Sequence, residues 1–156
     1  MLACRSIVQE VVMAFNPQLR SAWWTLRIGL ALGPIFAGID KFFDKLTNWE
    51  MYLHPAIPSL LHISAPAFMH IVGVIEIVAG ILVLTRFTRY AAYIVMLWLW
   101  AIALSLVVQG QFLDIAVRDI EVSLGAFALA KLTEAREAGL ELTPAAEKSA
   151  TLERPA

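Results

Sequence analysis

Apolar residues gather in four long runs that are separated by short stretches of polar and turn-forming residues. The runs cover residues 21–45, 67–84, 90–108 and 114–132. Each run is close to the ~20 residues that a helix needs to cross the hydrocarbon core of a bilayer. Trp23 and Trp24 lie near the start of the first run, where the aromatic belt of a membrane helix is expected. The pattern predicts an all-α integral membrane protein built as a four-helix transmembrane bundle.

The segments outside the four runs differ from them in composition. We expect residues 1–20 to form an N-terminal cytoplasmic or interfacial segment, with Met1 or Met13 as its start, and residues 21–132 to form the transmembrane domain. Residues 133–156 are rich in Glu, Ala, Lys and Thr, which predicts a disordered cytoplasmic tail. The long connection over residues 46–66 carries aromatic residues and prolines, so we expect it to lie in the headgroup layer or to cap the bundle.

Composition narrows the class of protein further. Of the 156 residues, 60% are hydrophobic and 16% are charged, and the mean hydropathy of +0.72 fits a bilayer rather than water. The net charge of −1, with scattered basic residues, argues against nucleic-acid binding. Cys4 is the only cysteine, so the chain offers no internal disulfide or thiolate cluster, and we expect no metal site. Motifs of nucleotide, zinc or nucleophile chemistry are absent from the sequence.

Six ionisable residues lie within or at the ends of the predicted spans, where a charge is costly. They are Asp40, Lys41, Glu76, Arg118, Asp119 and Glu121. Alternating helix directions bring the charges of the first and fourth spans to the same end, so we expect one polar cluster. Either the charges staple these two spans together, or they line a polar pocket with His54, His62 and His70 at its rim. Glu76 is then either a protonated carboxyl that hydrogen-bonds a neighbouring helix or a proton relay.

Small residues indicate which helix faces pack against other helices. Gly29, Gly33 and Ala37 recur at four-residue intervals and predict a smooth stripe for close helix contact. In the second run, one helical face carries two glycines and a glutamate, which are Gly73, Glu76 and Gly80. We expect this second face to point into the bundle.

The basic residues near the span ends predict the orientation in the membrane. On the side of the two termini lie Arg5, Arg20, Arg86, Arg89, Lys131 and Arg136, and on the other side lie Lys41, Lys45 and Arg118. Because Lys and Arg are enriched in cytoplasmic loops, we expect both termini to be cytoplasmic. Arg27 is expected to extend its guanidinium toward the headgroups on that side.

Short motifs along the chain match one known family in order and spacing. They are Arg27-Ile28-Gly29-Leu30, Phe36-Ala37-Gly38-Ile39-Asp40-Lys41-Phe42, Glu76-Ile77-Val78-Ala79-Gly80 and Arg118-Asp119-Ile120. In these motifs the chain resembles the DoxX family of small bacterial membrane proteins over residues 27–132. The resemblance implies a four-helix transmembrane fold. In some relatives it implies membership of a quinone-linked sulfur oxidation complex, or association with thiol and oxidative-stress proteins.

Three functions remain open from the sequence. The first is a non-catalytic inner-membrane subunit or anchor of a quinone-linked redox system, at most a subunit of an oxidoreductase, with quinone as the candidate cofactor and a redox enzyme as partner. The second is a transporter of a small solute or of protons, with Glu76 as the relay. The third is a structural or assembly protein whose charges only hold helices together. A homo-oligomer fits each of them, because small-residue stripes pack within or between chains. We expect a multi-pass protein of the bacterial inner membrane.

Overall fold

The computed structural model describes residues 17–152, which are helical and contain no strand. Its elements are α2 (Pro17–Asp40), the 3-10 helix η1 (Trp49–Tyr52), α3 (Ala56–Leu61), α4 (Ala65–Val83), α5 (Thr88–Gln109) and α6 (Leu113–Leu152). The all-α prediction is confirmed. Most of the expected N-terminal segment, with Met1, Met13 and Cys4, lies outside the described residues.

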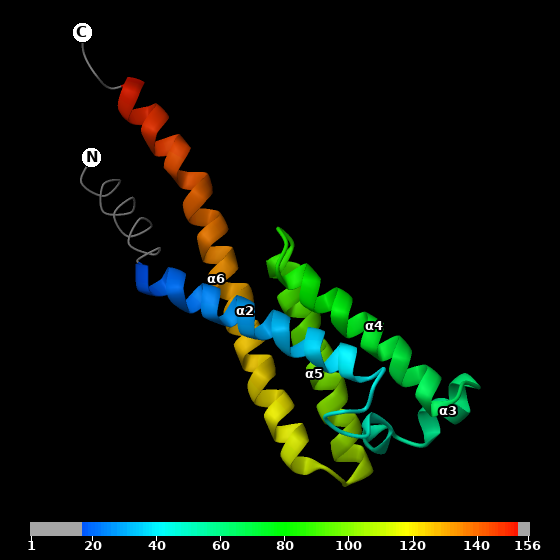
Figure 1. The fold of residues 1–156 in the computed structure, drawn as a ribbon. Coiled ribbons are helices and arrows are strands. Elements are labelled where there is room, and N and C mark those ends of the chain that lie inside the picture. Colours follow the sequence, from blue (N-terminus) through cyan, green and yellow to red (C-terminus); the bar gives the residue numbers. More distant parts are fainter. Residues whose placement is uncertain (1–16, 153–156) are drawn as a thin grey trace.

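The four long helices pack as two pairs (Figure 1). α2 packs along α4, and α5 packs along α6, to which it is joined by a short turn at Gly110. α2 also contacts α6, and α4 contacts α5, so that the pairs form one bundle. The left-handed conformation of Gly110 (φ 69°) ends α5 and turns the chain back into α6.

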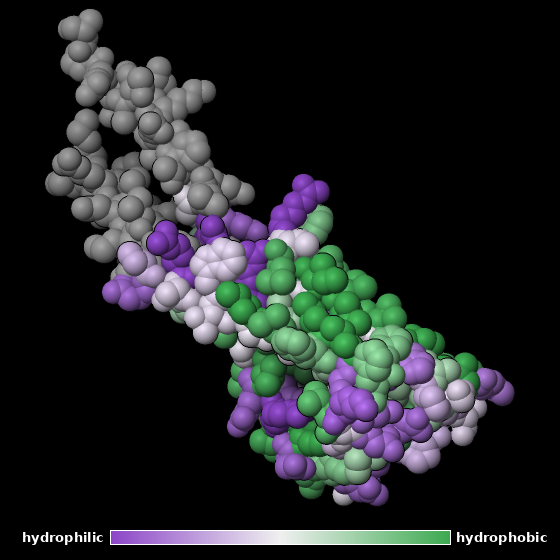
Figure 2. Space-filling model, in the orientation of Figure 1, coloured by the Kyte–Doolittle hydropathy of each residue, from purple (hydrophilic) through white to green (hydrophobic). Residues whose placement is uncertain are grey.

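Three of these helices, α2, α4 and α5, are long and apolar enough to cross a membrane. The fourth expected span is the first part of α6, which packs along α5. This part carries several charges near its start, so it is not apolar enough to count as a candidate membrane span. Figure 2 shows an apolar surface over the middle of the molecule and hydrophilic residues toward both ends. This distribution fits an integral membrane bundle.

α6 continues beyond the expected fourth span and through residues 133–152, where we expected an irregular tail. Its 40 residues correspond to a rod of about 60 Å, roughly twice the thickness of the hydrocarbon core. Two contacts hold the base of this extension against the other helices. Thr133 accepts a hydrogen bond from Trp23 of α2, and Glu134 accepts one from Tyr93 of α5.

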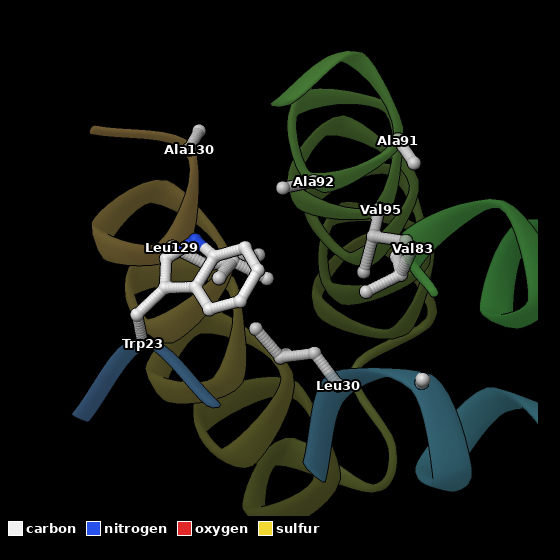
Figure 3. Close-up of a cluster of buried hydrophobic side chains, with 10 residues drawn as sticks. Trp23, Leu30, Val83, Ala91, Ala92, Val95, Leu129 and Ala130 are labelled. Atoms are coloured by element: carbon white, nitrogen blue, oxygen red, sulfur yellow. The ribbon is translucent and has the colours of Figure 1, made fainter. Parts of the chain in front are cut away.

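The larger hydrophobic core lies between the helices at the end of the bundle where α2 begins (Figure 3). Its buried residues are Trp23, Leu30, Ala31, Val83, Ala91, Ala92, Val95, Ala126, Leu129 and Ala130. Half of them are alanines, which allow the helix backbones to approach one another. A smaller cluster of Ala103, Leu106 and Ala116 lies at the opposite end, near Tyr52 and Phe112.

Glycines set the crossing of α2 over α4. A Cβ atom built on Gly73 would lie 2.7 Å from the carbonyl oxygen of Gly38, and one on Gly80 would lie 2.6 Å from that of Ala31. Distances this short leave no room for a side chain, so only glycine fits at these points. The prediction that the Gly73–Gly80 face of α4 points into the bundle is confirmed.

Gly29 and Gly33 of the predicted stripe on α2 make no close helix contact within the described chain, and packing of the stripe between chains stays a prediction. Gly29 and Gly33 are exposed, and a Cβ built on either would meet no atom within 4 Å. α2 instead turns its Ala31 and Gly38 side toward α4. Four-residue spacing shows which small residues share a face, but it does not show which face meets protein and which meets lipid.

Candidate functional site

A buried ion pair joins the end of α2 to the middle of α4. Nζ of Lys41 lies 2.6 Å from Oε2 of Glu76, and the two side chains are only 5% and 11% exposed. The close crossing at Gly38 and Gly73 brings them together, because Lys41 follows α2 directly and Glu76 shares a face with Gly73. Each of these two buried charges is stabilised by the other, because a single unpaired charge at this position would strongly destabilise the fold.

Asp40, the last residue of α2, holds the segment that follows it. Its carboxylate accepts hydrogen bonds from the backbone N–H of Lys45 (3.0 Å) and of Leu46 (3.0 Å to Oδ2). It also accepts one from the indole Nε1–H of Trp49 at 2.8 Å. We call residues 45–52 the strap. Asp40 fixes the strap across the end of the bundle. Within the described residues, the Asp40 carboxylate makes no ion pair.

Trp49 and Tyr52 seat the strap on the helices. The Trp49 ring lies over the ammonium group of Lys41, with Nζ 3.7 Å from the ring centroid, which is a cation–π contact. Tyr52 packs edge-on against Phe112, with 4.8 Å between ring centroids, and its hydroxyl lies 3.2 Å from that of Thr47. Trp49 therefore covers the Lys41–Glu76 pair, as expected of a connection that caps the bundle.

α5 and α6 add further polar groups beside Glu76. The indole N–H of Trp98 in α5 is buried and directed at Glu76, although it does not complete a hydrogen bond of standard geometry there. Asp119 of α6 is 6% exposed and close enough to Glu76 to act on its charge. Arg118, which is 62% exposed, donates to Oδ1 of Asp119 from Nη2 at 2.8 Å. All four long helices therefore contribute a polar group around Glu76.

The structure brings together most of the expected cluster, but with different partners. We expected the charges of the first and fourth spans to meet directly, whereas the ion pair between helices joins Lys41 to Glu76 and thus α2 to α4. Arg118 reaches the cluster only through its neighbour Asp119. Glu121 is exposed on α6 and has no ion pair within the described part of the chain.

The three histidines are dispersed. Nδ1 of His54 accepts a hydrogen bond from the backbone N–H of Ala56 (3.1 Å), and His62 adopts a left-handed conformation at the end of α3. His70 stacks on Phe42, with 4.9 Å between ring centroids. Their expected place at the rim of a pocket stays a prediction. Over residues 17–139, where side chains are described, no group of three His, Cys, Asp or Glu is arranged to hold a metal ion.

Trp49 and Trp98 are the members of the site that sequence reasoning missed. A tryptophan in a connection or in a charge-free helix is typical of the aromatic belt or of a lipid-facing position. The proximity of Trp49 to Asp40, nine residues earlier along the chain, was the one available signal, because a carboxylate at a helix end binds donors in the following loop.

A groove of about 370 Å³ lies on the outer side of α2 beside the root of the strap. It is lined by Phe36, Ile39, Asp40, Phe43, Lys45 and Leu46. The exposed apolar side chains of α2 make it open to lipid, and the Asp40 and Lys45 end lies where the strap begins. The groove thus leads from the lipid-facing surface to the residue that anchors the strap.

Arg27 of α2 binds the C-terminal end of α4. Its Nε donates to the carbonyl oxygen of Val83 (3.0 Å) and its Nη2 to that of Thr85 (2.7 Å), while the guanidinium packs against the ring of Trp23. It therefore binds the carbonyl groups at the end of α4, and its expected extension toward the headgroups on that side stays a prediction. Free carbonyls at a helix C-terminus attract a cation.

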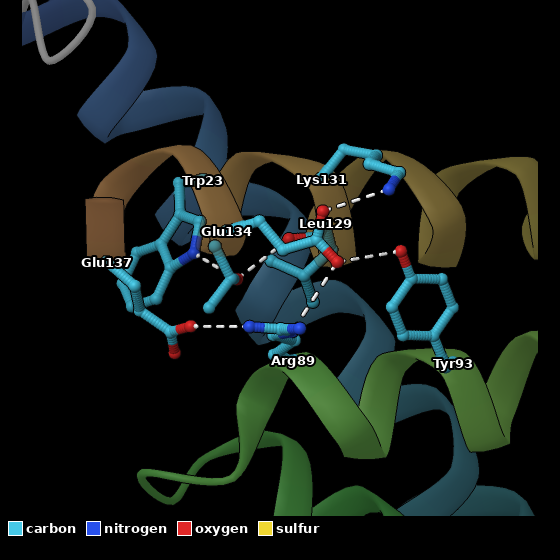
Figure 4. A network of polar contacts seen from close by, with 8 residues as sticks. Trp23, Arg89, Tyr93, Leu129, Lys131, Glu134 and Glu137 are labelled. Atoms are coloured by element: carbon cyan, nitrogen blue, oxygen red, sulfur yellow. Dashed lines mark hydrogen bonds and ion pairs between the residues drawn. The ribbon is translucent and has the colours of Figure 1, made fainter. Parts of the chain in front are cut away.

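Polar contacts at the same end fix α6 against α5 and α2 (Figure 4). Glu134 accepts from Nζ of Lys131 and from the hydroxyl of Tyr93, both at 2.9 Å, and it lies 3.4 Å from Nε of Arg89. The hydrogen bonds from Lys131 and Tyr93 lower the pKa of Glu134 below its usual value. Nε1 of Trp23 donates to Thr133 at 2.8 Å.

Comparison with known proteins identifies one family. The sequence model of DoxX matches residues 22–109, which is more than half of the chain and includes α2, the strap, α4 and α5. The match contains Lys41, Trp49, Glu76 and Trp98, and it ends before α6. No curated protein and no solved structure matches the chain.

Proposed function

This chain belongs to the DoxX family of membrane proteins, and we propose that it serves a quinone-linked redox system as a non-catalytic membrane subunit or anchor. One observation carries the proposal. Hydrogen-bond donors gather around Glu76 inside an apolar bundle: Lys41 donates to it at 2.6 Å, and the buried Trp98 indole N–H is directed at it without completing a hydrogen bond of standard geometry. A buried donor that its acceptor satisfies only partly remains available to a second acceptor, and a bound molecule with carbonyl oxygens would provide one.

The residues present fit a quinone. The carbonyl oxygens of a quinone accept hydrogen bonds, and Lys41 has two further N–H groups besides the one directed at Glu76. The lipid-facing groove beside Asp40 has the apolar lining that an isoprenoid tail needs. A bound quinone would carry electrons and protons within the membrane for a partner enzyme. In this proposal the chain's own side chains hold and orient the headgroup.

The distribution of basic residues supports an orientation with both termini in the cytoplasm of a bacterium and the strap on the outer side of its inner membrane. Six basic residues lie at the end of the bundle away from the strap, namely Arg20, Arg27, Arg86, Arg89, Lys131 and Arg136. Three lie toward the strap, namely Lys41, Lys45 and Arg118. The excess of Lys and Arg on one side is typical of the cytoplasmic side.

A purely structural role is the second candidate, because the Lys41–Glu76 pair sits directly beside the close crossing of α2 and α4. In that case the pair holds the two helices together and no ligand approaches it. The two roles differ in what the Trp98 donor does, since in a structural role it interacts only with the Glu76 carboxylate.

The test is binding of a short-chain ubiquinone or menaquinone analogue to the protein in lipid nanodiscs. Trp98→Phe removes an N–H that makes no hydrogen bond of standard geometry in the bundle, so it should weaken binding about three- to tenfold, the value of one hydrogen bond, at little cost in stability. Trp100→Phe is the matched control, because Trp100 is half exposed on the same helix. Saturable binding that is equal in the wild type and Trp98→Phe, or no binding at all, would remove the proposal.

A further inference from the structure

The strap over residues 45–52 covers the ion pair and contacts the helices beneath it through the partly buried side chains of Trp49 and Tyr52. We propose that the strap is a gate: with Trp49 seated on Lys41 the ion pair is closed to the adjoining aqueous phase, and release of the strap from Asp40 opens it. The identity of the ligand that enters rests on the proposed function, but the gate itself does not.

The first argument is occlusion. The ammonium group of Lys41 has the Glu76 carboxylate at 2.6 Å on one side and the Trp49 ring centroid at 3.7 Å on the other. A headgroup that accepts a hydrogen bond from this ammonium group needs the position that the Trp49 ring now occupies. The described structure therefore represents the closed state of the site.

The second argument is the anchor. Three donors on the strap, which are the Lys45 and Leu46 backbone N–H groups and the Trp49 indole, converge on the single carboxylate of Asp40. No residue of the 3-10 helix η1 is fully buried, and its packing on the bundle is limited to the partly buried Trp49 and Tyr52, so the hydrogen bonds to Asp40 are a main part of what holds the strap down. A segment that depends on a few hydrogen bonds opens more readily than the helices around it.

The third argument connects the anchor to the membrane. Asp40, Lys45 and Leu46 line the end of the lipid-facing groove, and the same three residues form the anchor. An apolar molecule that enters the groove from the lipid contacts the root of the strap. Occupation of the groove and opening of the strap are thus coupled through Asp40.

Modification of lysine side chains by a water-soluble acetylating reagent, followed by mass spectrometry, measures the gate in the full-length protein in nanodiscs. In the wild type we expect Lys41 to react at least about tenfold more slowly than the exposed Lys45 and Lys131. Trp49→Ala and Asp40→Asn should each raise the rate at Lys41 about tenfold, which corresponds to the loss of one hydrogen bond to a charged group.

Matched variants and a second measurement separate opening from unfolding. Trp100→Ala and Asp114→Asn make the same chemical changes at exposed sites outside the strap, and they should leave the rate at Lys41 unchanged. Backbone amides of α4 that keep the wild-type rate of hydrogen exchange show that a variant remains folded. Hydrogen exchange of the Lys45 and Leu46 amides does not depend on the reactivity of the Lys41 amine. Both amides should exchange about tenfold faster in Asp40→Asn.

Two results would overturn the gate. In one, wild-type Lys41 reacts as fast as Lys45, so that the pair is already open. In the other, Lys41 stays protected in both variants and the two amides exchange at the wild-type rate, so that helix packing alone shields the pair. The labelling experiment contains no quinone, so it tests the gate separately from the proposed function. If Lys41 is protected in the wild type and reactive in the strap variants, but the protein binds no quinone, the proposed function is refuted and the gate is supported.

Discussion

Replacing Glu76 by glutamine removes the acidic partner of Lys41 and leaves an ammonium group that is 5% exposed inside the bundle. Removal of one member of a buried ion pair typically costs about 3–5 kcal/mol. The Trp49 ring, 3.7 Å from Nζ, still contributes a cation–π contact of about 2 kcal/mol when desolvated, and the new amide oxygen can accept one hydrogen bond. We therefore expect Glu76→Gln to lower the free energy of unfolding by about 3 kcal/mol, at the lower end of that range.

The double variant Lys41→Met with Glu76→Met distinguishes loss of a partner from loss of packing. Both charges leave together and the side-chain lengths are kept, so its stability should lie within about 1 kcal/mol of the wild type. Lys131→Met removes an exposed ion pair of similar length (2.9 Å) and should cost less than about 1 kcal/mol.

Reversible unfolding in mixed detergent and sodium dodecyl sulfate measures these differences. The reasoning is refuted if Glu76→Gln is as stable as the wild type, because water would then reach Lys41. It is also refuted if the double variant is less stable than either single variant.

Three further predictions concern the helix crossing and the end of the bundle away from the strap. Gly73→Ala places a Cβ 2.7 Å from a backbone oxygen and should lower the free energy of unfolding by about 1–3 kcal/mol, whereas Gly33→Ala, with nothing within 4 Å, should be close to neutral in the same assay. Arg27→Gln removes the donors to two carbonyl groups at the end of α4 and should lower the thermal midpoint, with a cost of about 1–3 kcal/mol. The folded-state pKa of Glu134 is lowered, so its contribution is present above the unfolded value near 4.5 and is lost as the pH falls through the folded value. The difference in thermal midpoint between the wild type and Glu134→Gln should therefore shrink from pH 7 to pH 3.5, and a difference independent of pH would contradict this.

Hydrophobic periodicity was sufficient to predict the long helices and the face of α4 that packs against α2. The spacing of Gly73, Glu76 and Gly80 placed them on a single side of α4, and that side does meet α2. Within the described chain the same reasoning did not hold for Gly29 and Gly33, because small residues suit a lipid-facing surface as well as a helix contact. Only the position of the neighbouring helix decides between the two.

The partners of the charged residues could not be predicted from the sequence. Lys41 had acidic residues within reach on two other helices, and the choice of Glu76 depends on the 2.6 Å approach that the glycine crossing permits. The sequence suggested that Arg27 extends toward the headgroups. Its binding to the carbonyl groups at the end of α4 could not be predicted, because it depends on how the two helices pack. The contacts that α6 makes with α2 and α5 past residue 132 depend on helix packing in the same way.

The most direct test of the proposed role is gentle detergent extraction of the full-length protein from its native membrane, followed by mass spectrometry of the lipid-soluble molecules and proteins that remain bound. A quinone and an oxidoreductase should accompany the wild type and Trp100→Phe, and the quinone should be depleted from Trp98→Phe. Repeated preparations without quinone, or equal quinone content in all three proteins, would contradict a quinone-linked role and favour the structural one.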